Sequence, residues 1–153
     1  FYKNLNYVNA KLGIDPFEKE FNENKLVQIF KSRNRQVKAL ILDQSILTGM
    51  GNIYTDEALW NANIHPLSIS SKISIKKIKL LYNYIMRILE DSIKHHGTSF
   101  KDFIFDNMKT GSYKEKLNVY GRNGLNCNRC NNIIIKIKVA SRGTHICPHC
   151  QKK

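Results

Sequence analysis

Four cysteines in two closely spaced pairs have the clearest chemical capacity in this sequence. Cys127 and Cys130 form one Cys-x-x-Cys pair, and Cys147 and Cys150 form a second pair, with sixteen residues between the two pairs. Each pair can occupy a tight turn that directs two sulfur atoms toward one point, and two such turns complete a tetrahedral sulfur site suited to zinc. A site closed by four protein ligands has no position for a reactive water molecule. The spacing therefore predicts one structural Zn²⁺ that folds a small ribbon rather than a catalytic metal.

Two other uses of the cysteines fit less well. A two-disulfide module is expected in an oxidising compartment, and no secretory pattern accompanies these pairs. Redox chemistry at a single Cys-x-x-Cys would leave the second pair unexplained. His145 and His149 lie close to the second pair, and we interpret both as surface histidines rather than alternative metal ligands.

The charge of the chain is strongly positive and unevenly distributed. Among 153 residues there are 25 Lys and Arg against 12 Asp and Glu, a formal net charge of +13 with an isoelectric point near 9.7. From Lys116 to Lys153, the stretch that holds every cysteine, there is no acidic residue. Arg142 lies in the predicted hairpin tip Ser141–Thr144, where a planar guanidinium is well placed to bind a phosphate. A polyanionic partner such as nucleic acid is therefore expected.

The composition excludes several classes of protein. A hydrophobic content of 42% supports a packed core. No apolar run approaches the roughly 18 residues of a membrane-spanning helix. A basic domain bound to a membrane surface is disfavoured because no predicted helix combines a basic face with exposed aromatic residues.

The elements that must position these residues are mainly helical, followed by a small β ribbon. Apolar residues recur every three or four positions from Ser74 to about residue 96, which predicts a long amphipathic helix. Shorter helices are expected at 25–30, around 35–42, from Asn52 to about 62, and between 98 and 105. Alternation of apolar residues with lysines after residue 133 predicts strands. We predict a helical domain at 1–117 and a metal-stapled hairpin at 118–152.

Several ordered motifs resemble one known family. Gly49-Met-Gly-Asn52-Ile-Tyr-Thr-Asp-Glu-Ala-Leu59, followed by Ile64-His-Pro-Leu67, resembles the helix–two-turn–helix segment of bacterial formamidopyrimidine-DNA glycosylases. Val119-Tyr-Gly-Arg-Asn-Gly124 and Ser141-Arg-Gly-Thr-His-Ile-Cys-Pro-His-Cys-Gln151 continue the pattern into a four-cysteine zinc finger. The resemblance covers nearly the whole chain from about residue 12. The related endonuclease VIII branch shares the architecture but matches these two runs less well.

The resemblance implies a role in base-excision repair of oxidised purines, chiefly 8-oxoguanine and formamidopyrimidines. In such enzymes the damaged base is flipped out, an N-terminal proline amine attacks C1′, and β,δ-elimination cuts the strand. That proline belongs to an N-terminal β-sandwich domain, and the three prolines here are internal. We therefore expect this chain to be the DNA-binding C-terminal half, inactive by itself. The expected partners are damaged double-stranded DNA and its own N-terminal catalytic domain, in a monomer of the bacterial cytoplasm associated with the nucleoid.

The family's functional positions map onto particular residues of this chain. Asn52, with Gly51 beside it, corresponds to the asparagine that holds a phosphate next to the lesion. Arg142 corresponds to the zinc-finger arginine, which is credited with proton donation in δ-elimination. Because an arginine pKa above about 12 makes a poor acid, a phosphate clamp is the preferred role for Arg142. Weaker matches give further DNA contacts at Arg33, Arg35 and Lys38, and a lesion-recognition loop at Gly111, Ser112 and Tyr113.

A second hypothesis remains open from the sequence. The chain would then be a stand-alone zinc-ribbon module that binds nucleic acid without glycosylase activity. A generic ribbon of that kind has no need for the Gly51-Asn52 motif upstream, so this motif separates the two hypotheses.

Overall fold

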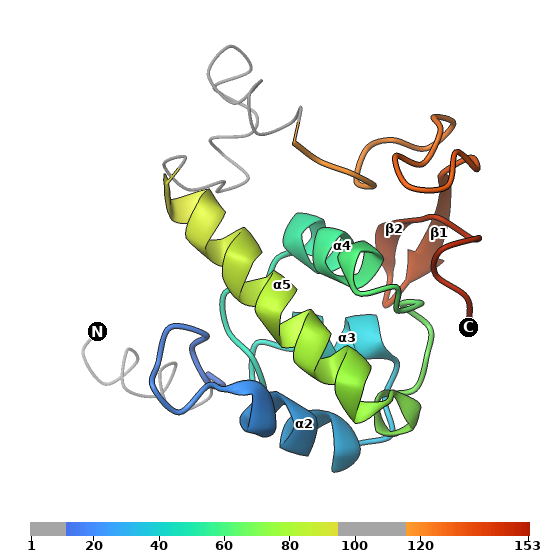
Figure 1. The fold of residues 1–153 in the computed structure, drawn as a ribbon. Coiled ribbons are helices and arrows are strands. Elements are labelled where there is room, and N and C mark those ends of the chain that lie inside the picture. The colour runs from blue at the N-terminus through green and yellow to red at the C-terminus, as the bar shows by residue number, and fades with distance from the viewer. Residues whose placement is uncertain (1–11, 95–115) are drawn as a thin grey trace.

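The fold is a group of helices with a two-stranded hairpin packed against one of them (Figure 1). The computed structural model describes residues 12–94 and 116–153. Its elements are α2 (Glu23–Lys31), α3 (Val37–Leu42), α4 (Asn52–Asn61), the short 3₁₀ helix η1 (Ser70–Lys72), α5 (Ile75–Lys94), β1 (Ile135–Val139) and β2 (Arg142–Ile146). Helix α5 packs against both α2 and α4, and α4 also packs against β2. Helix α4 is therefore the element that joins the helical part to the hairpin.

Helix α5 forms where the periodic apolar stripe predicts it. Ile78, Leu81, Ile85 and Leu89 are buried along one face, as expected for positions three and four residues apart. At its start, the Ser74 hydroxyl accepts a hydrogen bond from the N–H of Lys77 at 3.3 Å, which satisfies one of the free donors of the first turn. The predicted continuation to residue 96, the stop at Gly97 and the short helix at 98–105 lie outside the described residues.

The shorter helices also lie close to their predicted positions. Helix α2 begins after Asn22, whose side chain accepts the N–H of Lys25 at 2.8 Å. The predicted helix from Asn52 to about 62 corresponds to α4. Gly49 before it has a φ of +84°, a conformation that glycine adopts without steric cost. Gly49 thus makes the turn before α4 that the two glycines predict, whereas Gly51 is the N-cap in an extended conformation.

The core divides into two clusters of buried apolar side chains. The larger cluster gathers residues of the helices and their connections, from Phe21 to Leu89, and includes Leu117. The smaller cluster contains Trp60, Val119, Ile134 and two of the cysteines, Cys127 and Cys147. Trp60 lies near the end of α4, so this helix contributes to both clusters.

The hairpin differs from its prediction at the tip. Strands β1 and β2 are antiparallel, and Val139 pairs with Arg142 at the closed end. The turn therefore consists of Ala140 and Ser141, both with positive φ, at 52° and 62°, as a two-residue turn of this kind requires. The predicted tip Ser141–Thr144 is wrong, because Gly143 lies within β2 opposite Lys138. Arg142 is consequently the first strand residue, held by the ladder instead of by a flexible loop.

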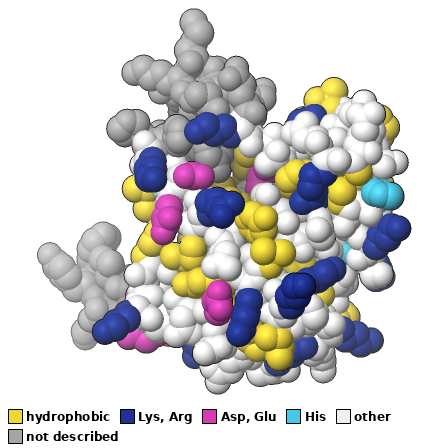
Figure 2. All heavy atoms as spheres, viewed as in Figure 1, with side chains coloured by type: hydrophobic (Ala, Val, Ile, Leu, Met, Phe, Trp, Pro, Cys, Tyr) yellow, Lys and Arg dark blue, Asp and Glu magenta, His cyan; other side chains and the backbone are white. Residues whose placement is uncertain are grey.

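No helix within residues 12–94 and 116–153 is long and apolar enough to cross a membrane. Figure 2 shows lysine and arginine side chains spread over the visible face, with fewer acidic groups among them. The positive charge seen in the sequence is therefore displayed on the molecular surface.

Candidate nucleic-acid interface and metal centre

The four cysteines converge as the sequence predicts. Their sulfur atoms all lie within 4.8 Å of one another, with 3.9 Å between Cys127 and Cys150 and 3.4 Å between Cys130 and Cys147. A regular tetrahedron with Zn–S bonds of about 2.3 Å has edges of about 3.8 Å. The ligand set and its spacing therefore fit one structural zinc ion. Cys127 and Cys147 are buried and the other two partly exposed, so a bound ion would be closed off from solvent on its inner side.

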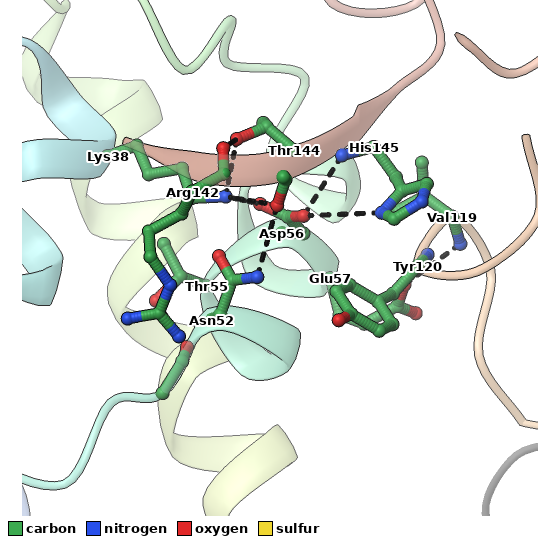
Figure 3. A network of polar contacts seen from close by, with 12 residues as sticks. Lys38, Asn52, Thr55, Asp56, Glu57, Val119, Tyr120, Arg142, Thr144 and His145 are labelled. Atoms are coloured by element: carbon green, nitrogen blue, oxygen red, sulfur yellow. Dashed lines mark hydrogen bonds and ion pairs between the residues drawn. The ribbon is translucent and has the colours of Figure 1, made fainter. Parts of the chain in front are cut away.

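Two adjacent carboxylates of α4 attach the zinc finger to the helices (Figure 3). Asp56 accepts the backbone N–H of His145, in β2, at 3.0 Å. Glu57 accepts three successive backbone N–H groups of the segment that enters the zinc finger, from Asn118 at 2.6 Å and from Val119 and Tyr120 at 2.8 Å each. Consecutive residues of one helix thus bind the entry to the zinc finger and its strand β2.

Glu57 experiences opposing electrostatic effects. Burial raises its pKa, whereas the three backbone N–H groups lower it, and the charge of neighbouring Asp56 raises it further. The net pKa is above the usual range of a glutamate. The three donors nevertheless give both carboxylate oxygens a partner, as a buried acid requires.

Lys38 is not at the surface, which corrects its prediction as a DNA contact. Its side chain is fully buried and forms an ion pair with Asp56, with 2.7 Å between Nζ and Oδ1. The ammonium also donates to Thr144 Oγ1 at 2.6 Å and to the carbonyl of Gly143 at 3.3 Å. Burial lowers the pKa of Lys38, and Asp56 acts against this. Lys38 therefore joins α3 and α4 to β2 and cannot reach a DNA phosphate.

Asn52 stands at the first position of α4 and reaches across to the hairpin. Its side-chain amide donates to the carbonyl of Gly143 at 3.0 Å, while its Oδ1 is buried without a partner. Gly51 is the N-cap and has no side chain to cap the helix. A Cβ at Gly51 would meet nothing within 4 Å. The start of α4 is thus left open, and such a helix end attracts anions through its free N–H groups and its dipole.

Arg142 lies next to the residue that Asn52 contacts. Figure 3 shows its side chain extending past Asn52 along the same side of the network. Arg142 is exposed, and its guanidinium has no hydrogen-bond or ion-pair partner among residues 12–94 and 116–153. It is close enough to Lys38 for its charge to lower the lysine pKa. The structure therefore brings together Asn52 and Arg142, 90 residues apart in the sequence, through Gly143.

The remaining predicted DNA contacts lie elsewhere. Arg33 folds back on α2, donating to the carbonyl of Ile29 at 3.3 Å and to the Ser32 hydroxyl at 3.1 Å. It lines a pocket of about 450 Å³ together with residues of the α3–α4 connection. Arg35 forms an ion pair with Asp43 at 2.7 Å, with 41% of its side chain exposed. Gly111, Ser112 and Tyr113 of the predicted recognition loop lie outside the described residues.

Several residues that hold the zinc finger against the helices could not be recognised from the sequence. His145 was interpreted as a surface residue, but it is 5% exposed, and its ring meets Tyr120 edge-on at 4.7 Å. His149 is exposed as expected. Gln151 joins the second cysteine turn to the connection that follows α4, since its side chain accepts the N–H of Cys147 and donates to the carbonyl of Ile64. Adjacent acids gave no signal for Asp56 and Glu57, because Glu90 and Asp91 form a second such pair that is exposed on α5.

Comparisons with known proteins agree with this arrangement. The formamidopyrimidine-DNA glycosylase H2TH domain matches residues 12–104, and a zinc finger found in FPG and IleRS matches residues 124–153. Formamidopyrimidine-DNA glycosylase of Lactobacillus acidophilus is 44% identical over 141 residues, which are 92% of this chain and 51% of that protein. The enzyme of Prochlorococcus marinus is 47% identical over 142 residues, 93% of this chain and 50% of that protein.

Solved structures show the same fold bound to DNA. The Lactococcus lactis glycosylase with DNA containing an AP site has a TM-score of 0.83 at 36% identity and covers 98% of this chain and 53% of its own. The structure of the same glycosylase with FAPY-dG-containing DNA has a TM-score of 0.84 at 37% identity. It covers 99% of this chain and 55% of its own. The chain therefore spans about half the length of the relatives it matches, and it belongs to the formamidopyrimidine-DNA glycosylase family, with the helix–two-turn–helix domain and the zinc finger of that family.

Proposed function

We propose that this chain binds damaged double-stranded DNA with Asn52 and Arg142 as a phosphate clamp. The observation that carries the proposal is the contact between Asn52 and Gly143, which places the open start of α4 beside an unpaired, exposed arginine. An amide has two N–H donors, so the one that does not bind Gly143 is available to a phosphate oxygen. A guanidinium and a helix N-terminus directed at one place together favour a phosphate group.

The contacts around Arg142 would make such a clamp rigid. Lys38 and Asn52 both donate to the carbonyl of Gly143, and Asp56 holds the adjacent His145. Arg142 thus extends from a strand whose next residues are fastened to the helices. Fixed phosphate contacts of this kind position a protein on DNA without reading its sequence. Damage would then be recognised by the ease with which the lesion nucleotide is displaced.

For the complete protein we propose the activity of its relatives, removal of oxidised purines and strand cleavage by β,δ-elimination. In this proposal the described residues bind the DNA, and an N-terminal catalytic domain supplies the nucleophile. Both domains would belong to one monomeric protein. By itself the chain is then inactive. Arg33 and the loop at Gly111, Ser112 and Tyr113 would add contacts near the lesion, and binding to chromosomal DNA would place the protein at the nucleoid.

The binding proposal is tested by fluorescence anisotropy with two duplexes. One duplex carries a single stable abasic-site analogue and the other is undamaged, each measured at two salt concentrations. We expect tighter binding to the abasic duplex. Asn52→Ala and Arg142→Gln should each weaken it about tenfold, because each removes a hydrogen bond to a charged group. Arg142→Gln should also reduce the log–log salt slope by about 0.9.

Matched control variants distinguish the effect of the proposed phosphate contacts from that of positive charge elsewhere on the surface. Arg87→Gln removes the same charge from an exposed position on α5, where Arg87 lies over the ring of Tyr84, and it should leave the preference for the abasic duplex unchanged. Asn52→Ala should fold normally, since Lys38 still serves the carbonyl of Gly143. Equal, salt-sensitive binding to both duplexes would instead favour a generic nucleic-acid-binding zinc module. Absence of binding at low salt would contradict both functions.

A further inference from the structure

A hollow with lysines at its rim lies at the far end of α4 from the proposed phosphate clamp. Its volume is about 520 Å³, and it is formed by the connection from α4 to α5, the first turn of α5 and the last residues of the chain, which lie side by side in Figure 1. Asn52 begins α4, whereas Asn63 of the hollow follows its end. The ten residues of α4 separate the two places by about 15 Å along the helix axis.

The floor of the hollow is apolar. Ile64 and Ile73 contribute buried side chains to it, and Leu67 and Ile69 are half-buried. Ile64 and Ile73 belong to the larger core cluster, but Leu67 and Ile69 lie outside both clusters. These two side chains therefore hold apolar surface in a concave place without taking part in the core, as is typical of sites that bind a ligand.

The rim of the hollow is positively charged. No acidic residue lines it among residues 12–94 and 116–153, and four exposed lysines do, namely Lys72, Lys77, Lys152 and Lys153. Burial and then the charge of Lys153 lower the pKa of His65, which shares the lining. Like charges gathered around one hollow repel one another, and an anionic partner would relieve that repulsion.

Hydrogen bonds fix the walls of the hollow. Lys77 donates from Nζ to the carbonyl of Asn63 at 3.1 Å, which joins α5 to the end of α4. The buried side chain of Gln151 donates to the carbonyl of Ile64 at 3.0 Å. An ammonium has three N–H donors, so Lys77 keeps two for a partner. A partner would therefore meet a surface that is already ordered, which lowers the cost of binding.

We propose that this hollow binds an acidic peptide segment of a partner protein, with carboxylates at the lysine rim and an apolar side chain against Leu67 and Ile69. Charge complementarity favours the carboxylates. The apolar floor favours a peptide over a DNA backbone, because phosphate contacts rely on charge and hydrogen bonds. The hollow shares no residue with the clamp of Asn52 and Arg142, so the two sites can be tested separately.

Fluorescence anisotropy with three short labelled peptides tests this binding on the zinc-loaded chain. The probe has three aspartates followed by leucine and phenylalanine. One control peptide has asparagines in place of the aspartates, and the other has serines in place of the two apolar residues. We expect the probe to bind about tenfold more tightly than either control, because it alone fits both rim and floor. Equal binding of the probe and the serine control would show attraction by charge alone and overturn the proposal.

Variants of the chain locate the binding site. Lys72→Gln with Lys77→Gln removes two rim charges and should weaken probe binding about tenfold. Lys76→Gln with Lys94→Gln removes the same charge from exposed positions on α5 that do not line the hollow, and it should weaken binding no more than about twofold. Leu67→Ser should reduce the affinity for the probe to that for the serine control. Equal effects of the two double variants would contradict binding in the hollow.

A ¹⁵N NMR titration with the probe needs no substitution. The backbone amides of Leu67, Ile69 and Ile73 should shift as the probe is added, while those of Gly51 and Asn52 should stay in place. Shifts at the start of α4 without shifts around the hollow would place the probe at the clamp and refute the proposal.

Duplex DNA is the competing occupant of the hollow. A saturating abasic duplex should leave the probe bound, and the double variant at Lys72 and Lys77 should weaken DNA binding no more than the control pair does. Displacement of the probe, or a selective loss of DNA affinity in that variant, would assign the hollow to DNA and overturn the peptide proposal. Asn52→Ala should leave probe binding unchanged, so failure of the clamp and failure of this site are distinguishable.

Discussion

The Nζ atom of Lys38 lies 2.7 Å from Oδ1 of Asp56, and neither side chain is exposed to solvent. This ion pair stands where α3, α4 and β2 meet, with Thr144 and the carbonyl of Gly143 completing the ammonium's partners. Asp56 uses its other oxygen for the N–H of His145. A buried charge is tolerated only when its partners are complete, so this pair fastens β2 of the zinc finger to α3 and α4.

Removing one member of the pair should be strongly destabilising. Lys38→Met leaves the Asp56 charge buried and is expected to lower the free energy of unfolding by about 3–5 kcal/mol. Lys38→Met combined with Asp56→Leu should cost less than the sum of the single changes, because no unpaired charge remains. Urea unfolding measures both. Arg35→Gln, which breaks the partly exposed pair with Asp43, should cost only about 0–1 kcal/mol. If Lys38→Met lowered the free energy of unfolding by as little as Arg35→Gln, the buried ion pair would not hold the structure together as described.

Glu57→Gln should detach the entry to the zinc finger. Both oxygens of Glu57 accept N–H groups, and the amide nitrogen of glutamine cannot accept, so at least one buried N–H loses its partner. We expect a cost of about 1–3 kcal/mol and faster hydrogen exchange at Asn118, Val119 and Tyr120. Glu90→Gln, at an exposed position on α5, is the control. Unchanged exchange at these three amides would contradict the prediction.

The two glycines before α4 should respond differently to alanine. Gly51 has a φ of −91° and open space around its Cβ position, so Gly51→Ala should fold with unchanged stability. It should bind DNA more weakly, because the added methyl group would stand at the helix end where we propose that a phosphate binds. Gly49 has a φ of +84°, and Gly49→Ala should lower stability by about 1 kcal/mol or more. Thermal unfolding measures the stability of both variants, and fluorescence anisotropy measures their affinity for DNA. Full DNA affinity in Gly51→Ala would argue against a phosphate at this helix end.

Zinc removal should unfold the smaller core cluster and spare most of the helices. The larger cluster contains no cysteine, whereas the smaller one includes two of the metal ligands and is too small to persist without them. After chelation we expect far-ultraviolet circular dichroism to retain most of the helical signal, Trp60 emission to shift to the red, and the preference for abasic DNA to disappear. Complete loss of helical signal would show instead that the two clusters unfold as one unit.

Asp43 should remain ionised in acid. Hydrogen bonds from Ser45 and Arg35 lower its pKa to about 2, against about 3.9 for an ordinary aspartate. A depressed pKa means that ionised Asp43 stabilises the folded state fully above about pH 4 and loses this effect as the pH falls toward 2. A carboxyl ¹³C NMR titration should find Asp43 still ionised at pH 3, and Ser45→Ala should move its midpoint upward. An ordinary midpoint in the unmodified chain would disprove the assignment.

Much of the fold could be predicted from local patterns. The apolar stripe of α5 and the glycines before α4 act through neighbouring residues, so their effects are visible in a single stretch of sequence. The cysteine pairs were equally clear, because tetrahedral zinc coordination demands that ligand type and spacing. The predicted turn at Ser141–Thr144 extends three residues too far, because the register of the strand pairing, which no local pattern gives, puts the turn at Ala140 and Ser141.

By itself the sequence determined the zinc ligands and the main helices, because each depends on residue type and short spacing, while the resemblance to the family indicated the two residues of the proposed clamp. Only the tertiary structure decided that Lys38 is an internal ion-pair partner and His145 a buried residue. A lysine that forms a buried pair and one that faces DNA look alike in sequence, since burial is set by elements distant along the chain. The contact of Asn52 with Gly143 likewise arises from the packing of α4 on β2, which no local pattern encodes.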